Sequence, residues 1–92
     1  MRILAIAVAA LGTFLLALAS STAARAQTCY NLWYERNSIY KQAGYCFKTA
    51  RAIRTFGNAG CQYDSEYELP LSARQRQRVA RIVRLERELG CR

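Results

Sequence analysis

Four cysteines, Cys29, Cys46, Cys61 and Cys91, are the residues of this 92-residue chain whose chemistry is easiest to assign. Thiols of this kind either pair as disulfides or bind zinc as thiolates. Structural zinc sites usually bring ligands in pairs roughly two to four residues apart. Successive cysteines here are 17, 15 and 30 positions apart, and the sequence has no histidine. The spacing therefore favours two disulfides, and we expect no metal site.

Four cysteines allow three pairings, and spacing alone leaves all of them open. Cys29 and Cys46 flank a predicted helix of about 14 residues, so they lie about 20 Å apart, beyond the reach of a disulfide. If a second helix returns beside the first and a third runs the other way, Cys61 approaches Cys29 and Cys91 approaches Cys46. The expected disulfides are therefore Cys29–Cys61 and Cys46–Cys91.

The first 26 residues have the layout of an export signal that is removed. Arg2 precedes an uncharged apolar run over residues 3–19, and residues 24–26, Ala-Arg-Ala, provide a cleavage point before Gln27. A retained membrane anchor is the alternative, but a span needs about 20 strongly apolar residues. We expect residues 27–92 to act in the periplasm or the medium, where disulfides form, without a stable membrane span.

Export would leave 66 residues, which allow one small domain and no second core. At that size two disulfides add stability that hydrophobic burial alone does not supply. Loss of Arg2 and Arg25 would leave 12 basic residues against six acidic ones, a net charge of +6. Such a domain attracts anions, which outside the cytoplasm are lipid phosphates, lipopolysaccharide and cell-wall carboxylates rather than nucleic acid. A charge that serves solubility alone is the alternative.

Apolar residues that recur every three or four positions predict an all-α fold with three helices. The first helix covers residues 30–43 and stops at Gly44. The second covers residues 50–56 behind the N-cap Thr49. A loop follows over residues 57–71, and its aromatic side chains are expected to fold back over the core. These aromatic residues are Tyr63 and Tyr67.

The third helix is predicted to run from the N-cap Ser72 to Leu89, with one apolar and one arginine-rich side. The expected apolar stripe comprises Val79, Ile82, Val83, Leu85 and Leu89. The other side carries six arginines, partly offset by Glu86 and Glu88. Arginine suits two-pronged binding of phosphate or carboxylate, although a GC-rich genome would produce the same preference over lysine. The candidate binding residues are Arg74, Arg78, Arg81, Arg84 and Arg87, with Arg76 beside them.

The sequence offers few groups for catalysis. It has no histidine to act as a general base, no glycine-rich phosphate loop and no Cys-x-x-Cys pair. Asp64, Glu66 and Glu68 cluster in the predicted loop, but they lack the ligand spacing and the glycine of a calcium-binding EF-hand. A solvated acidic loop is therefore expected, with neither enzymatic activity nor a cofactor.

Residues 36–47 resemble the signature of the YARHG domain, a short extracellular bacterial domain. The family pattern is Arg-Asn-x-Ile-Tyr-Ala-Arg-His-Gly-Tyr-x-Phe, and the resemblance extends over roughly residues 32–64. The pattern has Ala, Arg and His where this chain has Lys41, Gln42 and Ala43. The matching positions are Arg36, Asn37, Ile39, Tyr40, Gly44, Tyr45 and Phe47.

The matching residues can be interpreted physically as structural elements, with ligand binding as the alternative. Arg36 and Asn37 are expected to hydrogen-bond the loop that follows their helix. Gly44 frees the chain to reverse direction. The aromatic side chains are expected to close over Trp33 as a core; they belong to Tyr40, Tyr45 and Phe47.

Two functions follow from these features. The first is a non-catalytic module of the cell envelope whose arginine-rich helix docks an anionic component or a partner protein. The second is a small regulator or inhibitor that captures a partner protein through the loop around Tyr63, Asp64 and Tyr67, since loops on disulfide-bonded scaffolds often carry recognition.

Overall fold

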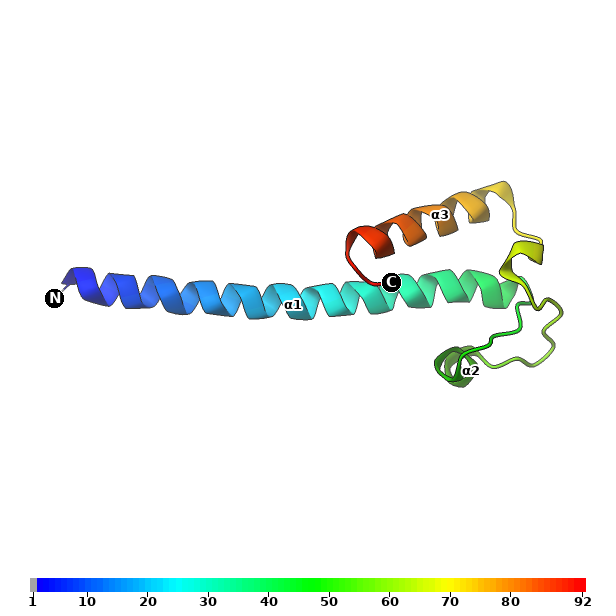
Figure 1. Ribbon diagram of the computed structural model, residues 1–92, viewed down its shortest axis with the longest axis horizontal. Coiled ribbons are helices and arrows are strands. Elements are labelled where there is room, and N and C mark those ends of the chain that lie inside the picture. The colour runs from blue at the N-terminus through cyan, green and yellow to red at the C-terminus, as the bar shows by residue number, and fades with distance from the viewer. Residues whose placement is uncertain (1) are drawn as a thin grey trace.

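The computed structural model describes the backbone of residues 2–92 and the side chains of residues 22–92. In that range the chain forms α1 (Arg2–Gln42), α2 (Ala50–Phe56), a short 3₁₀ turn η1 (Glu66–Glu68) and α3 (Ala73–Glu88), with one isolated β-bridge and no strand (Figure 1). The predicted all-α fold with three α-helices is confirmed. The apolar side chains of residues 3–19, which suggest an export signal, lie outside the described residues.

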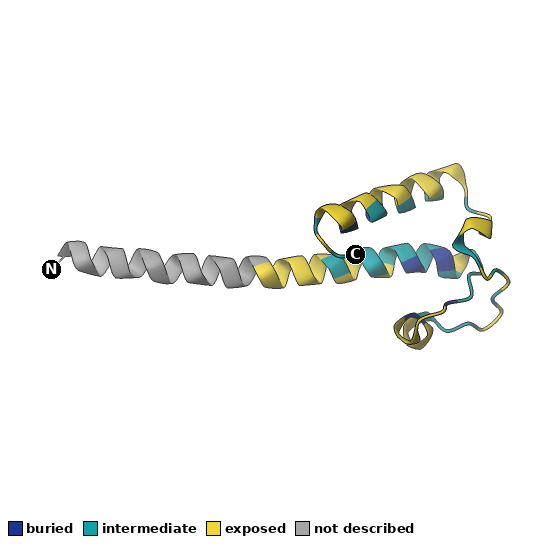
Figure 2. Cartoon of the chain, viewed as in Figure 1, coloured by how far each residue is buried: buried dark blue, intermediate teal, exposed yellow. Residues whose placement is uncertain are grey.

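The first helix is longer than predicted, because α1 does not begin near residue 30 but continues unbroken from Arg2. The preceding segment is rich in alanine and leucine, which favour helix, and it contains no proline. Residues 22–28 are exposed, whereas the part of α1 that follows packs against other elements (Figure 2). Across residues 22–92, whose side chains the structure describes, no helix combines the length and apolarity that crossing a bilayer requires.

The C-terminal end of α1 is a Schellman cap around Gly44, which has a left-handed φ of +95°. The N–H of Tyr45 donates to the carbonyl of Tyr40, and the N–H of Gly44 donates to the carbonyl of Lys41, each at 3.1 Å. The rings of Tyr40 and Tyr45 meet edge to face across this cap, with centroids 5.8 Å apart. The Tyr-x-x-x-Gly-Tyr part of the motif therefore ends the helix and reverses the chain.

The second helix, α2, has the predicted bounds and the predicted N-cap. The hydroxyl of Thr49 accepts a hydrogen bond from the N–H of Ala52 at 3.2 Å. Beyond the helix, the side chain of Asn58 accepts from the N–H of Phe47 at 2.7 Å and donates to its carbonyl at 3.0 Å. These bonds join the two ends of the α2 segment, so it forms a closed loop near the end of α1.

The third helix, α3, also begins at its predicted N-cap. The hydroxyl of Ser72 accepts from the N–H of Gln75 at 3.1 Å, and the Gln75 side chain accepts from the N–H of Ser72 at 2.9 Å, which completes a capping box. At the other end Gly90 is left-handed and the N–H of Cys91 donates to the carbonyl of Glu86 at 2.7 Å. Between these caps α3 runs antiparallel to the C-terminal part of α1 (Figure 1).

The core lies where α1, the α2 segment and the loop before α3 meet. It consists of Tyr40, Phe47, Ala52 and Leu69, with Trp33, Tyr45, Phe56 and Tyr63 packed against it. Phe47 and Phe56 stack with centroids 5.2 Å apart, and Trp33 lies 5.8 Å from Phe56. The predicted aromatic core is therefore confirmed.

Two predicted core contacts are wrong. Leu85, placed in the apolar stripe of α3, is 43% exposed, because the side of α3 that faces α1 carries Glu86 and the correctly predicted Ile82. Tyr67, expected to fold over the core with Tyr63, is 91% exposed. The η1 turn that contains Tyr67 points its side chain outward, while Tyr63 packs against Gly44.

The predicted disulfide pairing is also wrong: the structure joins Cys29 to Cys91 and Cys46 to Cys61. The prediction required α2 to return along α1, but α2 has only seven residues and stays near the end of α1. The loop after it passes Cys46, since the N–H of Cys46 donates to the carbonyl of Tyr63 at 2.8 Å. Antiparallel α3 then returns Cys91 to Cys29.

Candidate functional site

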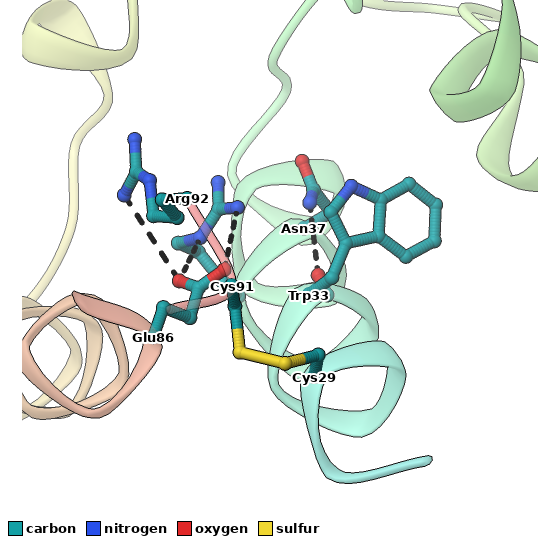
Figure 3. A network of polar contacts seen from close by, with 7 residues as sticks. Cys29, Trp33, Asn37, Glu86, Cys91 and Arg92 are labelled. Atoms are coloured by element: carbon teal, nitrogen blue, oxygen red, sulfur yellow. Dashed lines mark hydrogen bonds and ion pairs between the residues drawn. A yellow bond between two sulfur atoms is a disulfide. The ribbon is translucent and has the colours of Figure 1, made fainter. Parts of the chain in front are cut away.

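A buried ion pair between Arg36 of α1 and Glu86 of α3 joins the two long helices. Arg36 Nε donates to Glu86 Oε1 at 2.8 Å, and Arg36 Nη2 donates to Glu86 Oε2 at 3.1 Å. The two side chains are 12% and 2% exposed. Glu86 lies beside the Cys29–Cys91 disulfide, and Arg92 approaches the same carboxylate at 4.0 Å (Figure 3). The disulfide and the ion pair thus both attach the C-terminal end of α3 to α1.

The charge of Arg36 is set by two opposing effects. Burial lowers the pKa of the guanidinium, but the hydrogen bonds and the negative charge of Glu86 outweigh burial and raise the pKa of Arg36 above its ordinary value. Burial of the neighbouring Tyr40 raises the pKa of its phenol, and the negative charge of Glu66 raises this pKa further. The arginine is therefore held as a permanent cation that its partner neutralises.

The sequence-based expectation for these groups was wrong. Glu86 was placed with the surface charges of α3, and Arg36 and Asn37 were expected to bond the following loop. Asn37 instead donates to the carbonyl of Trp33 within α1 at 2.8 Å. A signal for Glu86 was present, because it follows the buried Ile82 by four residues and so lies on the same helix face.

Five of the seven matching motif residues, all except Ile39 and Gly44, line a cavity of about 210 Å³ between α1 and the α2 segment. Lys48 and Glu66 bring a positive and a negative group to its wall, although Lys48 also pairs with Asp64 at 3.0 Å. Gly44 is absent from the cavity wall, since its role is to cap the helix. The motif residues in the wall are Arg36, Asn37, Tyr40, Tyr45 and Phe47.

The three positions that depart from the family pattern lie at the end of α1. Lys41 Nζ donates to the carbonyl of Gly57 at 3.2 Å, which ties α1 to the end of α2. Gln42 is exposed, and Ala43 packs against the rim of the core. None of the three lines the motif cavity. The pattern therefore contributes only matching positions to the cavity wall, and residues outside the pattern complete the wall.

A family profile of the YARHG domain matches residues 11–87. The chain belongs to the YARHG domain family. This YARHG domain is of an extracellular type, and two disulfides fit a protein that is exported. The match reaches beyond residues 32–64, over which the motif resemblance extends, and takes in most of α3. No curated protein and no solved structure matches the chain.

The arginines of the YARHG domain's α3 are all exposed, but they are not equivalent. Arg78 pairs with Glu35 of α1, and the guanidinium of Arg76 donates to the carbonyl of Leu71. The guanidinium groups of the other four make no hydrogen bond or ion pair with any residue in the range 22–92. These are Arg74, Arg81, Arg84 and Arg87.

A helical projection separates these arginines into two groups. At 100° per residue, four of them fall within an arc of about 120°, and Arg78, at the edge of this arc nearest to α1, reaches Glu35; they are Arg74, Arg78, Arg81 and Arg84. We call these the outer arginines. Arg76 and Arg87 lie about 20° apart on one flank of the helix and line a separate groove.

The acidic loop residues are dispersed rather than clustered. Asp64 pairs with Lys48 at the surface, Glu66 lines the motif cavity and Glu68 is exposed. Of the loop residues proposed for partner recognition, Tyr63 is packed against the core and Tyr67 is exposed.

The cation–π contact of Arg51, a basic residue outside α3, was not predicted from the sequence. The guanidinium of Arg51, on α2, lies 3.9 Å from the ring centroid of Trp33 and 5.6 Å from that of Tyr30. Such stacking attracts the cation to the aromatic faces and covers part of them. It also bridges α2 to α1.

Proposed function

We propose that this YARHG domain is a non-catalytic binding module of the bacterial cell envelope, which docks an anionic component through the arginines of α3. The observation that supports this most directly is that four exposed arginines on one helix lack any partner within residues 22–92. Guanidinium groups present forked donors that match phosphate and carboxylate oxygens. Unpaired arginines at this density are therefore available for an external anion.

The fold supports the proposal by making α3 a rigid carrier. The capping box fixes its start, while the Cys29–Cys91 disulfide and the buried Arg36–Glu86 pair fix its end on α1. Arg74 lies in the first turn of α3, where the helix dipole disfavours positive charge by a few tenths of a kcal/mol. An arginine at the positive end of the helix dipole lowers the stability of the helix, so its presence is better explained by binding of an anion.

The proposal includes export and the absence of catalysis. Cleavage before Gln27 would deliver the domain to an oxidising compartment, periplasm or medium, in which both disulfides form. The thiols of all four cysteines are then bonded, and the sequence has no histidine to act as a base. On this proposal the domain binds an anionic envelope component and performs no chemistry itself. Any reaction is carried out by a partner protein.

Charge reversal at two outer arginines tests the proposal. We expect Arg81→Glu with Arg84→Glu to weaken retention on anionic envelope probes at least tenfold, since each basic group near an anionic surface contributes about 1 kcal/mol. Retention of the wild type should itself fall steeply between low and high salt, as screening shortens the reach of the charges. Co-sedimentation with isolated peptidoglycan, lipopolysaccharide and phosphatidylglycerol vesicles measures both effects.

The matched control carries the same charge change away from α3, in the variant Lys48→Glu with Arg54→Glu. Both of these side chains are exposed, and the exposed Lys48–Asp64 pair contributes little to stability. Equal losses in the two double variants would show that only net charge matters and would remove α3 as the docking element.

A small regulator that captures a partner protein is a second candidate, supported by the 91% exposure of the aromatic Tyr67. On this alternative, Tyr67→Ala abolishes capture of a protein from envelope extract, with little dependence on salt, because aromatic anchors act by burial. Tyr30→Ala, at another exposed tyrosine, serves as the control. Capture that survives Tyr67→Ala would eliminate the loop as a recognition site.

A further inference from the structure

A groove of about 390 Å³ runs along one flank of α3, between that helix, η1 and the end of α1. Its floor and walls are largely apolar. Val79 and Val83 come from α3 and Leu71 from the segment before it, while Tyr67 stands beside them on η1. The two valines are only half-buried, so neither α1 nor the loop covers them fully. An apolar surface is therefore left open next to the arginine-rich face.

Positive side chains bracket this groove. Arg76 and Arg87 are separated by 11 positions, which is about 16 Å along the helix axis, and they share one flank with Val83 between them. Arg92 lines the groove as well, and Glu66 is the acidic residue in its wall. Arg87 has no partner within residues 22–92, and Arg76 engages one carbonyl and keeps further N–H donors. The groove thus presents an apolar centre between cationic ends.

The side chain of Tyr67 completes an amphipathic pattern. It is 91% exposed although it is aromatic, and it stands at the edge of the groove, next to Glu66 of the same turn, which lines the groove as well. Tyrosine has an apolar ring and a polar hydroxyl, so it favours boundaries between water and an apolar phase. An exposed aromatic beside an apolar groove with arginines at both ends matches the chemistry of a lipid headgroup boundary.

We propose that this groove is the surface with which the domain contacts an anionic lipid bilayer, with Arg76 and Arg87 meeting lipid phosphates and Tyr67, Val79 and Val83 facing the apolar boundary. This inference rests on the proposed function, because it assigns the anionic component to a lipid and the contact to one flank of α3. A carbohydrate or cell-wall polymer would engage the arginines but would leave the apolar centre wet. A bilayer surface matches both the arginines and the apolar centre, since it offers phosphate anions and an apolar layer within a short depth.

The test compares two pairs of neutral substitutions on the same helix. Arg76→Gln with Arg87→Gln removes the groove cations, and Arg74→Gln with Arg84→Gln removes the same charge from the outer arginines. Purified, oxidised protein is co-sedimented with vesicles of phosphatidylglycerol and phosphatidylcholine, and with phosphatidylcholine alone, at about 0.1 M salt, where the screening length is about 10 Å. We expect the groove pair to lower partitioning at least tenfold and the outer pair to lower it several times less than the groove pair does.

Two further variants test whether a loss of vesicle binding could come from unfolding or from the change in net charge. Arg87→Gln alone removes a side chain whose guanidinium has no partner within residues 22–92, and an unchanged circular dichroism spectrum would show that a loss of vesicle binding does not reflect unfolding. Tyr67→Ser should lower partitioning about fivefold while the salt dependence of binding stays as in the wild type, because it removes apolar contact and no charge. Tyr30→Ser, at an exposed tyrosine outside the groove, is the matched control.

The possible outcomes separate this inference from the proposed function. Equal effects of the groove and outer pairs, or no effect of Tyr67→Ser, would overturn the groove as the lipid contact and leave α3 as a general anion-binding helix. Retention on isolated peptidoglycan without retention on anionic vesicles would overturn the lipid and keep the envelope module. Absence of binding to every anionic probe would overturn both.

Discussion

Replacing Glu86 with alanine is expected to lower the free energy of unfolding by about 3–5 kcal/mol, because the substitution leaves the Arg36 guanidinium buried without its partner. Domains of 66 residues, the length expected after cleavage before Gln27, have a free energy of unfolding of about 3–10 kcal/mol, so the variant should lose about a third of its stability or more. Urea titration followed by far-ultraviolet circular dichroism measures the change. Glu88→Ala, two positions later and exposed, is the control and should alter stability by less than about 0.5 kcal/mol.

The double variant Arg36→Met with Glu86→Leu separates the loss of the pair from the burial of a single charge. Removing both charges while keeping the volume should restore stability to within about 1 kcal/mol of the wild type, or exceed it, since buried ion pairs are often no better than apolar contacts. A Glu86→Ala variant as stable as Glu88→Ala would contradict the buried ion pair. A double variant as unstable as Glu86→Ala would show that the pair has a role beyond neutralising charge.

The second large effect concerns the disulfides. Removing the Cys29–Cys91 bridge with Cys29→Ala and Cys91→Ala should lower the free energy of unfolding by about 4 kcal/mol, and removing Cys46–Cys61 in the same way by about 3 kcal/mol. The difference arises because the first bridge closes a separation of 62 residues and the second one of 15, so the first restricts the unfolded chain more. Urea unfolding of the two double variants gives both values.

The connectivity itself can be checked before any stability is measured. Proteolysis of the oxidised protein without reduction should release one peptide pair that contains Cys29 and Cys91 and another that contains Cys46 and Cys61. Recovery of Cys29 joined to Cys61 would contradict the antiparallel placement of α3 on α1. Single substitutions at these cysteines are less informative, because the unpaired thiol left behind can form non-native bridges.

The YARHG signature in this chain has a structural explanation at most of its positions. Arg36 neutralises Glu86 of α3, Asn37 bonds the backbone of its own helix, and Gly44 ends that helix with a left-handed residue. The aromatic positions build the core and the cap. The signature therefore specifies how α1 ends and how α3 attaches to it, and the surface of α3 is free to carry the binding chemistry.

Local sequence was sufficient wherever a feature depends on a few neighbouring residues. Thr49 and Ser72 were recognised as N-caps and Gly44 as a helix end, because each acts through hydrogen bonds to positions within five residues of it. The presence of two disulfides followed from the cysteine spacing, the lack of histidine and the export signal. The start of α1 was missed, since no proline marks a boundary before Tyr30, and Thr28, a residue type common at N-caps, instead donates its hydroxyl to the carbonyl of Ala24 inside the helix at 2.8 Å.

The amino-acid sequence by itself determined three α-helices, the caps of α2 and α3, the aromatic core and membership of an exported type of domain. Only the tertiary structure decided which cysteines pair, that Glu86 is buried and that a groove lies beside the arginines of α3. These features depend on the direction and rotation of α3 against α1, which are set by contacts between residues about 50 positions apart, such as Arg36 and Glu86. Periodicity identifies an apolar face, but it cannot show that a charged residue on that face will meet its partner across the helix interface.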